Sequence, residues 1–119
     1  GCVFDETTMF KLTALEIANC SCTDAIGLPD PFVTLQSPSS SASTNTCSDV
    51  VGCKFSSGSI DVTAGDLVAG KVTFHVYDED TSFDDDCGGG AIKLPSPIVP
   101  ATYEVSVGGQ TFTFKVDAK

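Results

Sequence analysis

Five aspartates in two short segments have the types and spacing of a metal-binding site. Asp24 and Asp30 are separated by five residues, and Asp78, Asp80 and Asp86 follow at relative positions zero, two and eight. Carboxylates packed together repel one another, so such a cluster is costly unless a cation neutralises it. Calcium takes about six to eight oxygen ligands in irregular geometry, which suits carboxylates supplied by separate loops. The two segments therefore predict a calcium site.

The second acidic segment differs from the calcium loop of an EF-hand. Between Asp80 and Asp86 there is no central glycine, and no terminal Glu follows that could bind an ion through both oxygens. The ligands would therefore have to come from separate loops. A solvated acidic patch is the alternative interpretation, and it explains the charge but not the spacing. Asp84 and Asp85 are expected to be exposed, although either could add a ligand.

Each acidic segment also carries apolar residues between its aspartates. Ile26 and Leu28 lie in the first segment and Phe83 in the second. Exposed apolar residues at scattered positions need no explanation. Gathered beside bound calcium, they would form an edge that can insert into a membrane, where burial of one such side chain contributes about 1.5–3 kcal/mol. We expect these three side chains to be membrane-insertion residues.

Alternating apolar residues predict a strand directly before the second acidic segment, with Val72, Phe74 and Val76 on one face. Residues 108–109 are two glycines between two further alternating runs, which is a hairpin signal because both can adopt positive φ. The expected strands are 9–18, 32–35, 71–77, 103–107 and 112–116, with another short strand or two within 54–62. Several short strands without a sustained helical period indicate an all-β sandwich or barrel.

The chain is expected to form one domain over residues 1–119, since single domains cluster at roughly 100–150 residues. The alternation in the first apolar run slips near Ala14-Leu15, which suggests a bulge. Residues 37–48 are nearly all Ser, Thr, Ala, Asn and Pro, so they are expected to be a loop or a ragged edge. Loops gather at the two ends of a sandwich. The acidic segments, about 22–31 and 78–88, can therefore converge at one end.

The net charge of −10 and the basic residues exclude several classes of function. The chain has six lysines, no arginine and no basic cluster, so no nucleic-acid partner is expected. His75 is the single histidine and falls within a predicted strand, and no nucleophile-elbow motif is present. Residues 88–90 are glycines without the following Lys of a phosphate-binding loop. The chain is therefore predicted not to be an enzyme.

Six cysteines indicate disulfides and an oxidising compartment. Their spacing does not match a zinc site, and a single histidine cannot complete a mixed one. The disulfide candidates are Cys2, Cys20, Cys22, Cys47, Cys53 and Cys87. Sequence alone leaves about 15 pairings open, among which a local Cys47–Cys53 pair is favoured. We expect an extracellular or secreted protein, with the cell surface and the periplasm as alternatives.

No stretch of the chain approaches the roughly 20 apolar residues that span a bilayer, so no transmembrane segment is expected. No signal peptide is present either, and we expect a mature fragment or a domain of a larger secreted protein. The Gly1-Cys2 start could alternatively mark a lipoprotein, but lipidation of Cys2 would leave an odd number of cysteines.

Together, the two acidic segments resemble those of C2 domains, the family of calcium- and phospholipid-binding β-sandwiches. Family members carry an aspartate, five residues and a second aspartate followed by Pro, an aromatic residue and Val, as in Asp24 and Asp30-Pro31-Phe32-Val33. Their third calcium loop follows an apolar-aromatic pair, here Val76-Tyr77. The aspartates of that loop are matched by Asp78, Asp80 and Asp86.

The resemblance implies an eight-stranded antiparallel Greek-key β-sandwich that binds about two calcium ions through the five aspartates. Calcium would bridge the loops to lipid phosphates, so that the module docks its parent protein on a phospholipid membrane surface. The protein would be a monomer or a domain of a larger secreted protein. The alternative is a structural calcium site in a disulfide-stapled extracellular adhesion or protein-interaction domain that does not bind membranes.

The chain also departs from the family pattern. The Asn-Pro-x-Trp signature is missing from residues 46–72, and so is the lysine-rich strand of some members, which argues against phosphoinositide binding. Cys22 lies two residues before Asp24, and Cys87 directly follows Asp86. On the resemblance, a Cys22–Cys87 disulfide would tie the first calcium loop to the third and preorganise the site.

Overall fold

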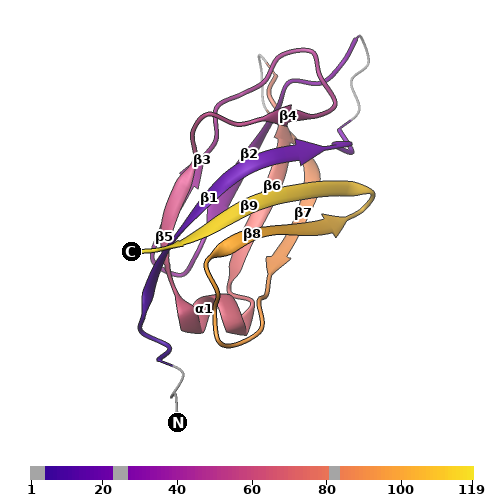
Figure 1. Cartoon of the computed structure of the whole chain (residues 1–119). Helices are drawn as coiled ribbons and strands as arrows, with labels where there is room; N and C mark the ends of the chain where they lie inside the picture. The colour runs from indigo at the N-terminus through magenta and orange to yellow at the C-terminus, as the bar shows by residue number, and fades with distance from the viewer. Residues whose placement is uncertain (1–4, 23–26, 81–83) are drawn as a thin grey trace.

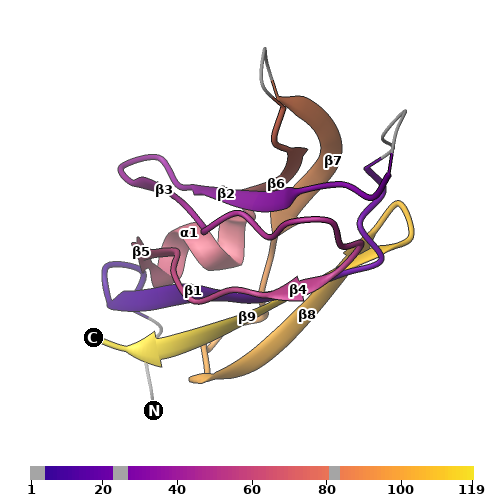
Figure 2. The ribbon, with the colours of Figure 1, turned by 90° about the horizontal axis from the view of Figure 1, so that it is seen from above.

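Two antiparallel β-sheets face each other in the computed structural model, which describes residues 5–22, 27–80 and 84–119 (Figure 1). The described residues form β1 (Met9–Ala18), β2 (Pro31–Gln36), β3 (Ser41–Ser43), β4 (Cys53–Lys54), β5 (Ser59–Thr63), α1 (Ala64–Ala69), β6 (Val72–Asp78), β7 (Asp85–Ile92), β8 (Ala101–Val107) and β9 (Gln110–Ala118). The larger sheet has the order β4-β1-β9-β8, with β5 also paired to β1, and the smaller has the order β3-β2-β6-β7. Figure 2 shows the sheets as two layers. The predicted all-β sandwich is therefore confirmed.

Two of the strands, β4 and β5, lie one after the other along the same edge of β1. β4 pairs with Glu16 and Ile17, whereas β5 pairs with residues 9–13 of β1. The opposite edge of β1 pairs with β9. The nine strands of the described residues therefore fill eight strand positions, the number expected for the predicted sandwich.

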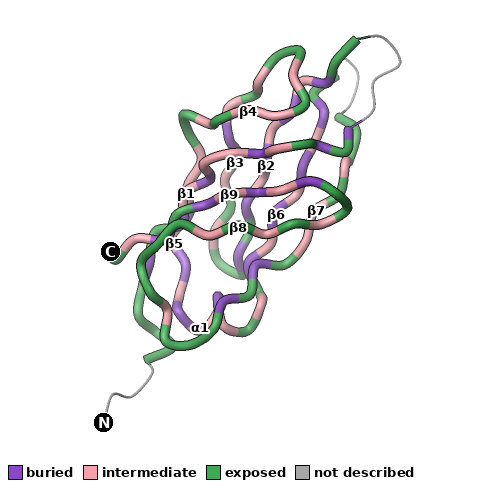
Figure 3. The backbone as a smooth tube through the Cα atoms, turned by 45° about the vertical axis from the view of Figure 1, so that its right-hand side comes forward, coloured by how far each residue is buried: buried purple, intermediate pink, exposed green. Residues whose placement is uncertain are grey.

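The core lies between the two sheets and is supplied by strand alternation. Val72, Phe74 and Val76 of β6 point inwards and are 0% exposed, as their alternation predicts. Phe74 stacks on Phe112 of β9 with ring centroids 4.8 Å apart, which joins the two sheets. Figure 3 shows buried and more exposed residues alternating along these strands. The next inward position of β6 is Asp78, so the same alternation carries a carboxylate into the interior.

Two irregularities predicted from the sequence are present in the larger sheet. The register of β1 against β9 shifts between Ala14 and Glu16, where the apolar alternation slips. Gly108 and Gly109 form the turn between β8 and β9 with φ values of 60° and 84°, a region that residues with side chains rarely adopt. This turn places Gln110 at the first position of β9.

Two short elements complete the fold. β3 pairs with residues 34–36 of β2 at the edge of the smaller sheet, which agrees with the expected ragged edge within 37–48. α1 was not predicted, because six residues are too few to show a helical period. It buries Leu67 at the end of the sandwich opposite the acidic segments (Figure 1). None of the helices formed by the described residues has the length and apolar character needed to span a bilayer.

Replacing Thr63 with Ala is expected to destabilise the protein modestly, because Thr63 caps α1. Its Oγ1 accepts a hydrogen bond from the backbone N–H of Asp66 at 3.1 Å. Loss of such a cap costs about 1 kcal/mol, which corresponds to a fall of about 4 °C in the unfolding temperature. Thermal unfolding followed by circular dichroism measures the shift, and Thr63→Ser, which keeps the hydroxyl, is the control. An unfolding temperature unchanged in Thr63→Ala would contradict this role.

Candidate metal site

Three carboxylates converge where β6 ends and β7 begins. Asp78 is the last residue of β6 and lies directly opposite Asp85, the first residue of β7. One carboxylate oxygen from each of Asp78, Asp80 and Asp85 lies within 4.8 Å of the others. The backbone N–H of Asp80 donates to Oδ1 of Asp84 at 3.1 Å, which helps to shape the chain between the strands. Three like charges this close favour a bound cation.

Asp78 is the buried member of this cluster. It is 1% exposed, and its Oδ1 accepts a hydrogen bond from the backbone N–H of Asp30 at 2.8 Å. Its Oδ2 is buried and has no hydrogen-bond partner among the described residues. Leaving a buried polar atom unsatisfied costs about 1–3 kcal/mol, and more for a charged group. A cation beside Oδ2 would remove this penalty, so the residues present fit a metal ion.

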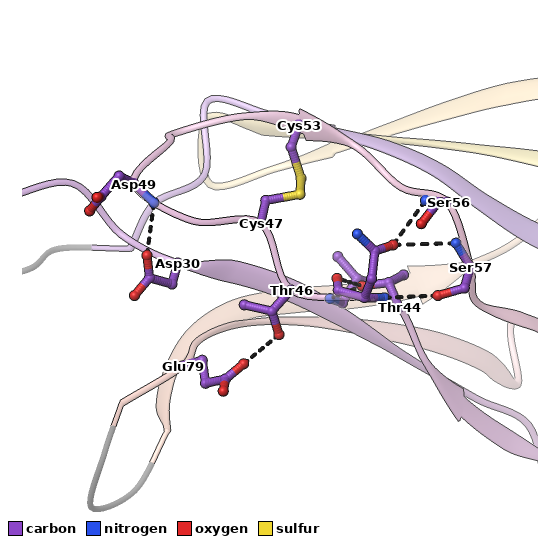
Figure 4. Close-up of a disulfide and its surroundings, with 11 residues drawn as sticks. Asp30, Thr44, Thr46, Cys47, Asp49, Cys53, Ser56, Ser57 and Glu79 are labelled. Carbon is purple, nitrogen blue, oxygen red and sulfur yellow. Dashed lines mark hydrogen bonds between the residues drawn. A yellow bond between two sulfur atoms is a disulfide. The ribbon is translucent and has the colours of Figure 1, made fainter.

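Asp30 is held next to Asp78 by the pairing of β2 with β6. Pro31 lies opposite Asp78, and the carbonyl of Asp30 accepts from the backbone N–H of Glu79 at 3.0 Å. Oδ1 of Asp30 also accepts from the backbone N–H of Asp49 at 2.8 Å (Figure 4). The structure therefore brings Asp30, Asp78 and Asp80 of the predicted ligand set to the same end of the sandwich.

The position of Asp86 depends on a β-bulge in β7. The register between β6 and β7 shifts by one residue between His75 and Tyr77, so Asp86 lies opposite Tyr77 and Asp85 takes the place opposite Asp78. Oδ1 of Asp86 accepts a hydrogen bond from the backbone N–H of Gly88 at 2.8 Å. Asp85 is exposed, as expected from the sequence, and it joins the cluster. Its place in the cluster could not be read from motif spacing, although the glycines after Cys87 signal a bulge.

Several predicted site residues lie outside the described part of the chain: Asp24, Ile26, Phe83 and Cys2. Their roles stay predictions. Leu28 is described and is 51% exposed, and its role in membrane insertion also stays a prediction.

Two disulfides flank the cluster. Cys22 pairs with Cys87, with Cα atoms 4.9 Å apart, which connects the stem of the first acidic segment to β7. Cys47 pairs with Cys53, six residues on, as favoured from the sequence (Figure 4). Both Cα separations, 4.9 Å and 6.4 Å, lie within the usual range for disulfides. Cys20, another disulfide candidate, is instead a buried free thiol, and the four cysteines of the two disulfides are not open to it as partners.

A buried glutamine reinforces the Cys22–Cys87 connection. Gln110 is 1% exposed and uses both ends of its amide. Its Oε1 accepts from the backbone N–H of Ser21 at 2.9 Å, and its Nε2 donates to the carbonyl of Cys87 at 3.0 Å. A satisfied buried amide of this kind fixes the segments that it joins. Nothing in the sequence around Gln110 pointed to this role.

The Cys20 thiol is expected to react slowly with alkylating reagents in the folded protein. Burial raises the pKa of this thiol, a hydrogen bond from the backbone of Cys22 opposes the rise, and the negative charge of Asp78 adds to it. A raised pKa leaves less of the reactive thiolate at any given pH. Mass spectrometry after iodoacetamide treatment of a Cys2→Ser variant measures the rate, with the same protein in denaturant as control. Equal rates in both conditions would contradict the burial of Cys20.

A cavity of about 320 Å³ adjoins the carboxylate cluster. Among the described residues it is lined by Asp30, Thr46, Ser48, Glu79 and Asp80. The predicted ligands Asp30 and Asp80 therefore border an open hollow next to the carboxylate cluster, where there is room for a metal ion.

Solved structures share this architecture. A calcium-bound structure of the C2A and C2B domains of Extended-Synaptotagmin 2 has a TM-score of 0.72 and 13% identity, over 98% of this chain and 47% of that one. A structure of a C2 domain has a TM-score of 0.66 and 17% identity, over 93% of this chain and 99% of that one. Human GIVD cytosolic phospholipase A2 has a TM-score of 0.69 and 19% identity, over 93% of this chain and 17% of that one.

These identities are low, so the similarities establish the fold. No protein-family model matches the sequence, and no curated protein sequence matches it. The chain spans 17% of the phospholipase and 47% of the Extended-Synaptotagmin chain.

Proposed function

We propose that this chain, which has the fold of a C2 domain, is a calcium-binding module that docks its parent protein on phospholipid membranes. The observation that carries the proposal is the buried carboxylate of Asp78. Its Oδ2 is unpartnered among the described residues, and one oxygen of the same carboxylate lies within 4.8 Å of an oxygen of Asp80 and one of Asp85. Such a group is costly in the folded protein unless a cation binds beside it.

The ligands in this proposal are carboxylates from two segments. Asp78 and Asp80 are the central ligands, and the outer ligands are Asp24, Asp30 and Asp86. The structure adds Asp85 to the candidates, because it faces Asp78 across the sheet. About two calcium ions would share these oxygens, given that each ion takes roughly six to eight.

Bound calcium would supply positive charge and coordination positions open to lipid phosphates. Leu28, which is 51% exposed, would then enter the apolar part of the membrane together with Ile26 and Phe83. The chain itself has no catalytic role in this proposal. The two disulfides favour an oxidising environment, so we place the protein outside the cell or in a secreted form.

A second function is favoured by the disulfides themselves. Cys22–Cys87 and Cys47–Cys53 already hold the segments around the cluster. A calcium ion added to this frame could be purely structural, in an extracellular adhesion or protein-interaction domain that does not bind membranes. Extracellular calcium modules bind weakly, with dissociation constants of about 10⁻⁴–10⁻³ M, and would be permanently loaded.

Sedimentation with phospholipid vesicles separates the two functions. Membrane docking predicts that the protein sediments with vesicles in calcium and stays in solution with a chelator. Leu28→Ser should weaken vesicle binding about three- to tenfold, because the half-exposed Leu side chain loses its burial in the membrane. Val99→Ser is the matched control, since Val99 is 57% exposed and lies between β7 and β8, away from the cluster. Calcium binding without sedimentation would favour the structural role.

A further inference from the structure

An exposed valine near the carboxylate cluster belongs to neither acidic segment. Among the described residues, the large apolar side chains that are strongly exposed are Met9, Leu28, Val51 and Val99. Val51 is 47% exposed and lies between the two cysteines of the Cys47–Cys53 disulfide. A single exposed apolar side chain needs no explanation, so the neighbours of Val51 decide whether it has a role.

Val51 lies next to Leu28, the exposed residue of the first acidic segment. The backbone N–H of Val50 donates to the carbonyl of Pro29 at 2.9 Å. Further hydrogen bonds on one side of this pair show that the two segments run antiparallel. Leu28 comes one residue before Pro29, and Val51 comes one residue after Val50. The two exposed apolar residues are therefore neighbours on the surface, although 23 residues separate them in the chain.

The segment that carries Val51 is fixed in position. The Cys47–Cys53 disulfide closes it (Figure 4), and the carbonyl of Val51 accepts from the backbone N–H of Cys20 at 2.7 Å. Gly52 packs so closely on the end of β1 that a Cβ there would lie 2.9 Å from a backbone carbonyl oxygen. The backbone is therefore held on both sides of an exposed apolar side chain. A preformed contact of this kind lowers the ordering cost of binding.

The carboxylates beside this apolar pair indicate what kind of partner it has. Oδ1 of Asp30 accepts from the backbone N–H of Asp49, and the backbone N–H of Asp30 donates to Oδ1 of Asp78. Leu28 and Val51 therefore border the proposed calcium site. A partner that reaches both needs an anionic group for the ion and apolar surface for the two side chains. A phospholipid has both, in its phosphate and its acyl chains.

We infer that Val51 enters the bilayer beside Leu28, so that the disulfide-closed segment, residues 47–53, is a membrane contact in its own right. This inference rests on the proposed function and adds to it a contact that neither acidic segment supplies. Its rigidity distinguishes this contact from a loop that has to be ordered when the membrane binds.

The overall charge of the domain makes apolar contacts important. The net charge is −10, and two calcium ions carry four positive charges, which leaves −6. A negatively charged domain is not attracted over long distances to an anionic membrane surface. The membrane affinity therefore has to come from contacts made at the surface, and burial of apolar side chains is a large contribution of this kind.

A tryptophan placed at this position reports insertion directly, because the chain has no tryptophan of its own. The test adds vesicles of phosphatidylcholine with a minor fraction of phosphatidylserine to the protein in calcium. The emission of Val51→Trp should shift to shorter wavelength and be quenched by brominated acyl chains, and a chelator should reverse both effects. Val99→Trp is the matched control, since Val99 is 57% exposed but lies between β7 and β8. Its emission should show neither effect.

A truncation at the same position measures what the contact contributes. Val51→Ser should weaken sedimentation with these vesicles about threefold, because a half-exposed valine loses its burial in the membrane. The calcium affinity should stay unchanged, since the valine side chain has no oxygen to offer the ion. Val99→Ser should change neither quantity.

The outcomes separate this inference from the proposed function. Calcium-dependent sedimentation of the wild type with an unshifted emission of Val51→Trp would overturn the insertion of Val51 alone. Vesicle binding of Val51→Ser equal to that of the wild type would do the same. Failure of the wild type to sediment with vesicles in calcium would overturn both.

Discussion

Replacing Asp78 with Asn is expected to lower the calcium affinity by at least about 100-fold, which corresponds to about 2.7 kcal/mol. Asp78 is 1% exposed, so water cannot readily replace the interaction of its carboxylate with calcium. Two unit charges about 4 Å apart interact by about 4 kcal/mol at an effective dielectric constant of about 20. The removal of one full charge from the centre of the site is therefore sufficient for a loss of this size.

The same substitution should not lower the stability of the calcium-free protein. The side-chain oxygen of Asn can still accept from the backbone N–H of Asp30, as Oδ1 of Asp78 does at 2.8 Å. The new amide N–H₂ replaces the unpartnered oxygen with a donor near the carboxylates of Asp80 and Asp85, each of which has an oxygen within 4.8 Å of the Asp78 carboxylate. Repulsion within the cluster also falls. We expect the calcium-free variant to be at least as stable as the wild type.

Thermal unfolding in chelator and in millimolar calcium checks both expectations. The wild type should unfold at a higher temperature in calcium, because a ligand that binds only the folded state stabilises it. Asp78→Asn should show no such rise. Glu104→Gln removes one exposed carboxylate on β8 and should keep the full rise. A calcium-dependent rise retained in Asp78→Asn would place the ion elsewhere.

Removing the Cys22–Cys87 disulfide is the second change with a large expected effect. The two cysteines are 65 residues apart, and closing a loop of that length stabilises the folded state by roughly 4 kcal/mol in the chain-entropy model. We expect Cys22→Ser/Cys87→Ser to lose most of this stability. The calcium affinity should fall about tenfold as well, because the first acidic segment is no longer held against β7 and must be ordered when calcium binds.

Cys47→Ser/Cys53→Ser is the matched control for this variant. The two cysteines are only six residues apart, so removal of their disulfide should lower the free energy of unfolding by roughly 2 kcal/mol. This variant keeps the Cys22–Cys87 disulfide and Gln110. Its calcium affinity should therefore fall less than that of Cys22→Ser/Cys87→Ser. Chemical denaturation gives the two free energies of unfolding, and a calcium titration gives the affinities. Equal calcium affinities in wild type and Cys22→Ser/Cys87→Ser would show that the disulfide stabilises the fold without preorganising the site.

The sequence was informative where local patterns decide the structure. The alternation of Val72, Phe74 and Val76 predicts β6, and its continuation places Asp78 in the interior. The glycines at 108–109 predict the β8–β9 hairpin, because a two-residue turn requires positive φ at both positions. Burial and turn geometry are set by neighbouring residues, which is why these features could be read from the chain.

Features that depend on packing between distant segments could not be predicted in the same way. The bulge in β7 shifts the register by one residue, so that Asp85, and not Asp86, lies opposite Asp78. The role of Gln110 requires that Ser21 and Cys87 approach it from other strands. The contact of Thr46 with Glu79 likewise depends on how the segment before β4 packs against β6.

Isothermal titration of calcium into the oxidised, chelator-stripped protein shows whether the carboxylates bind the ion. We expect saturable binding of about two ions, with dissociation constants of about 10⁻⁴–10⁻³ M for a site of the extracellular kind and lower values for a calcium sensor. Magnesium, which demands stricter octahedral geometry and gives up its waters reluctantly, should bind more weakly. Absence of calcium binding up to several millimolar would contradict the account, and the carboxylates of Asp78, Asp80 and Asp85 would then need another neutralising partner.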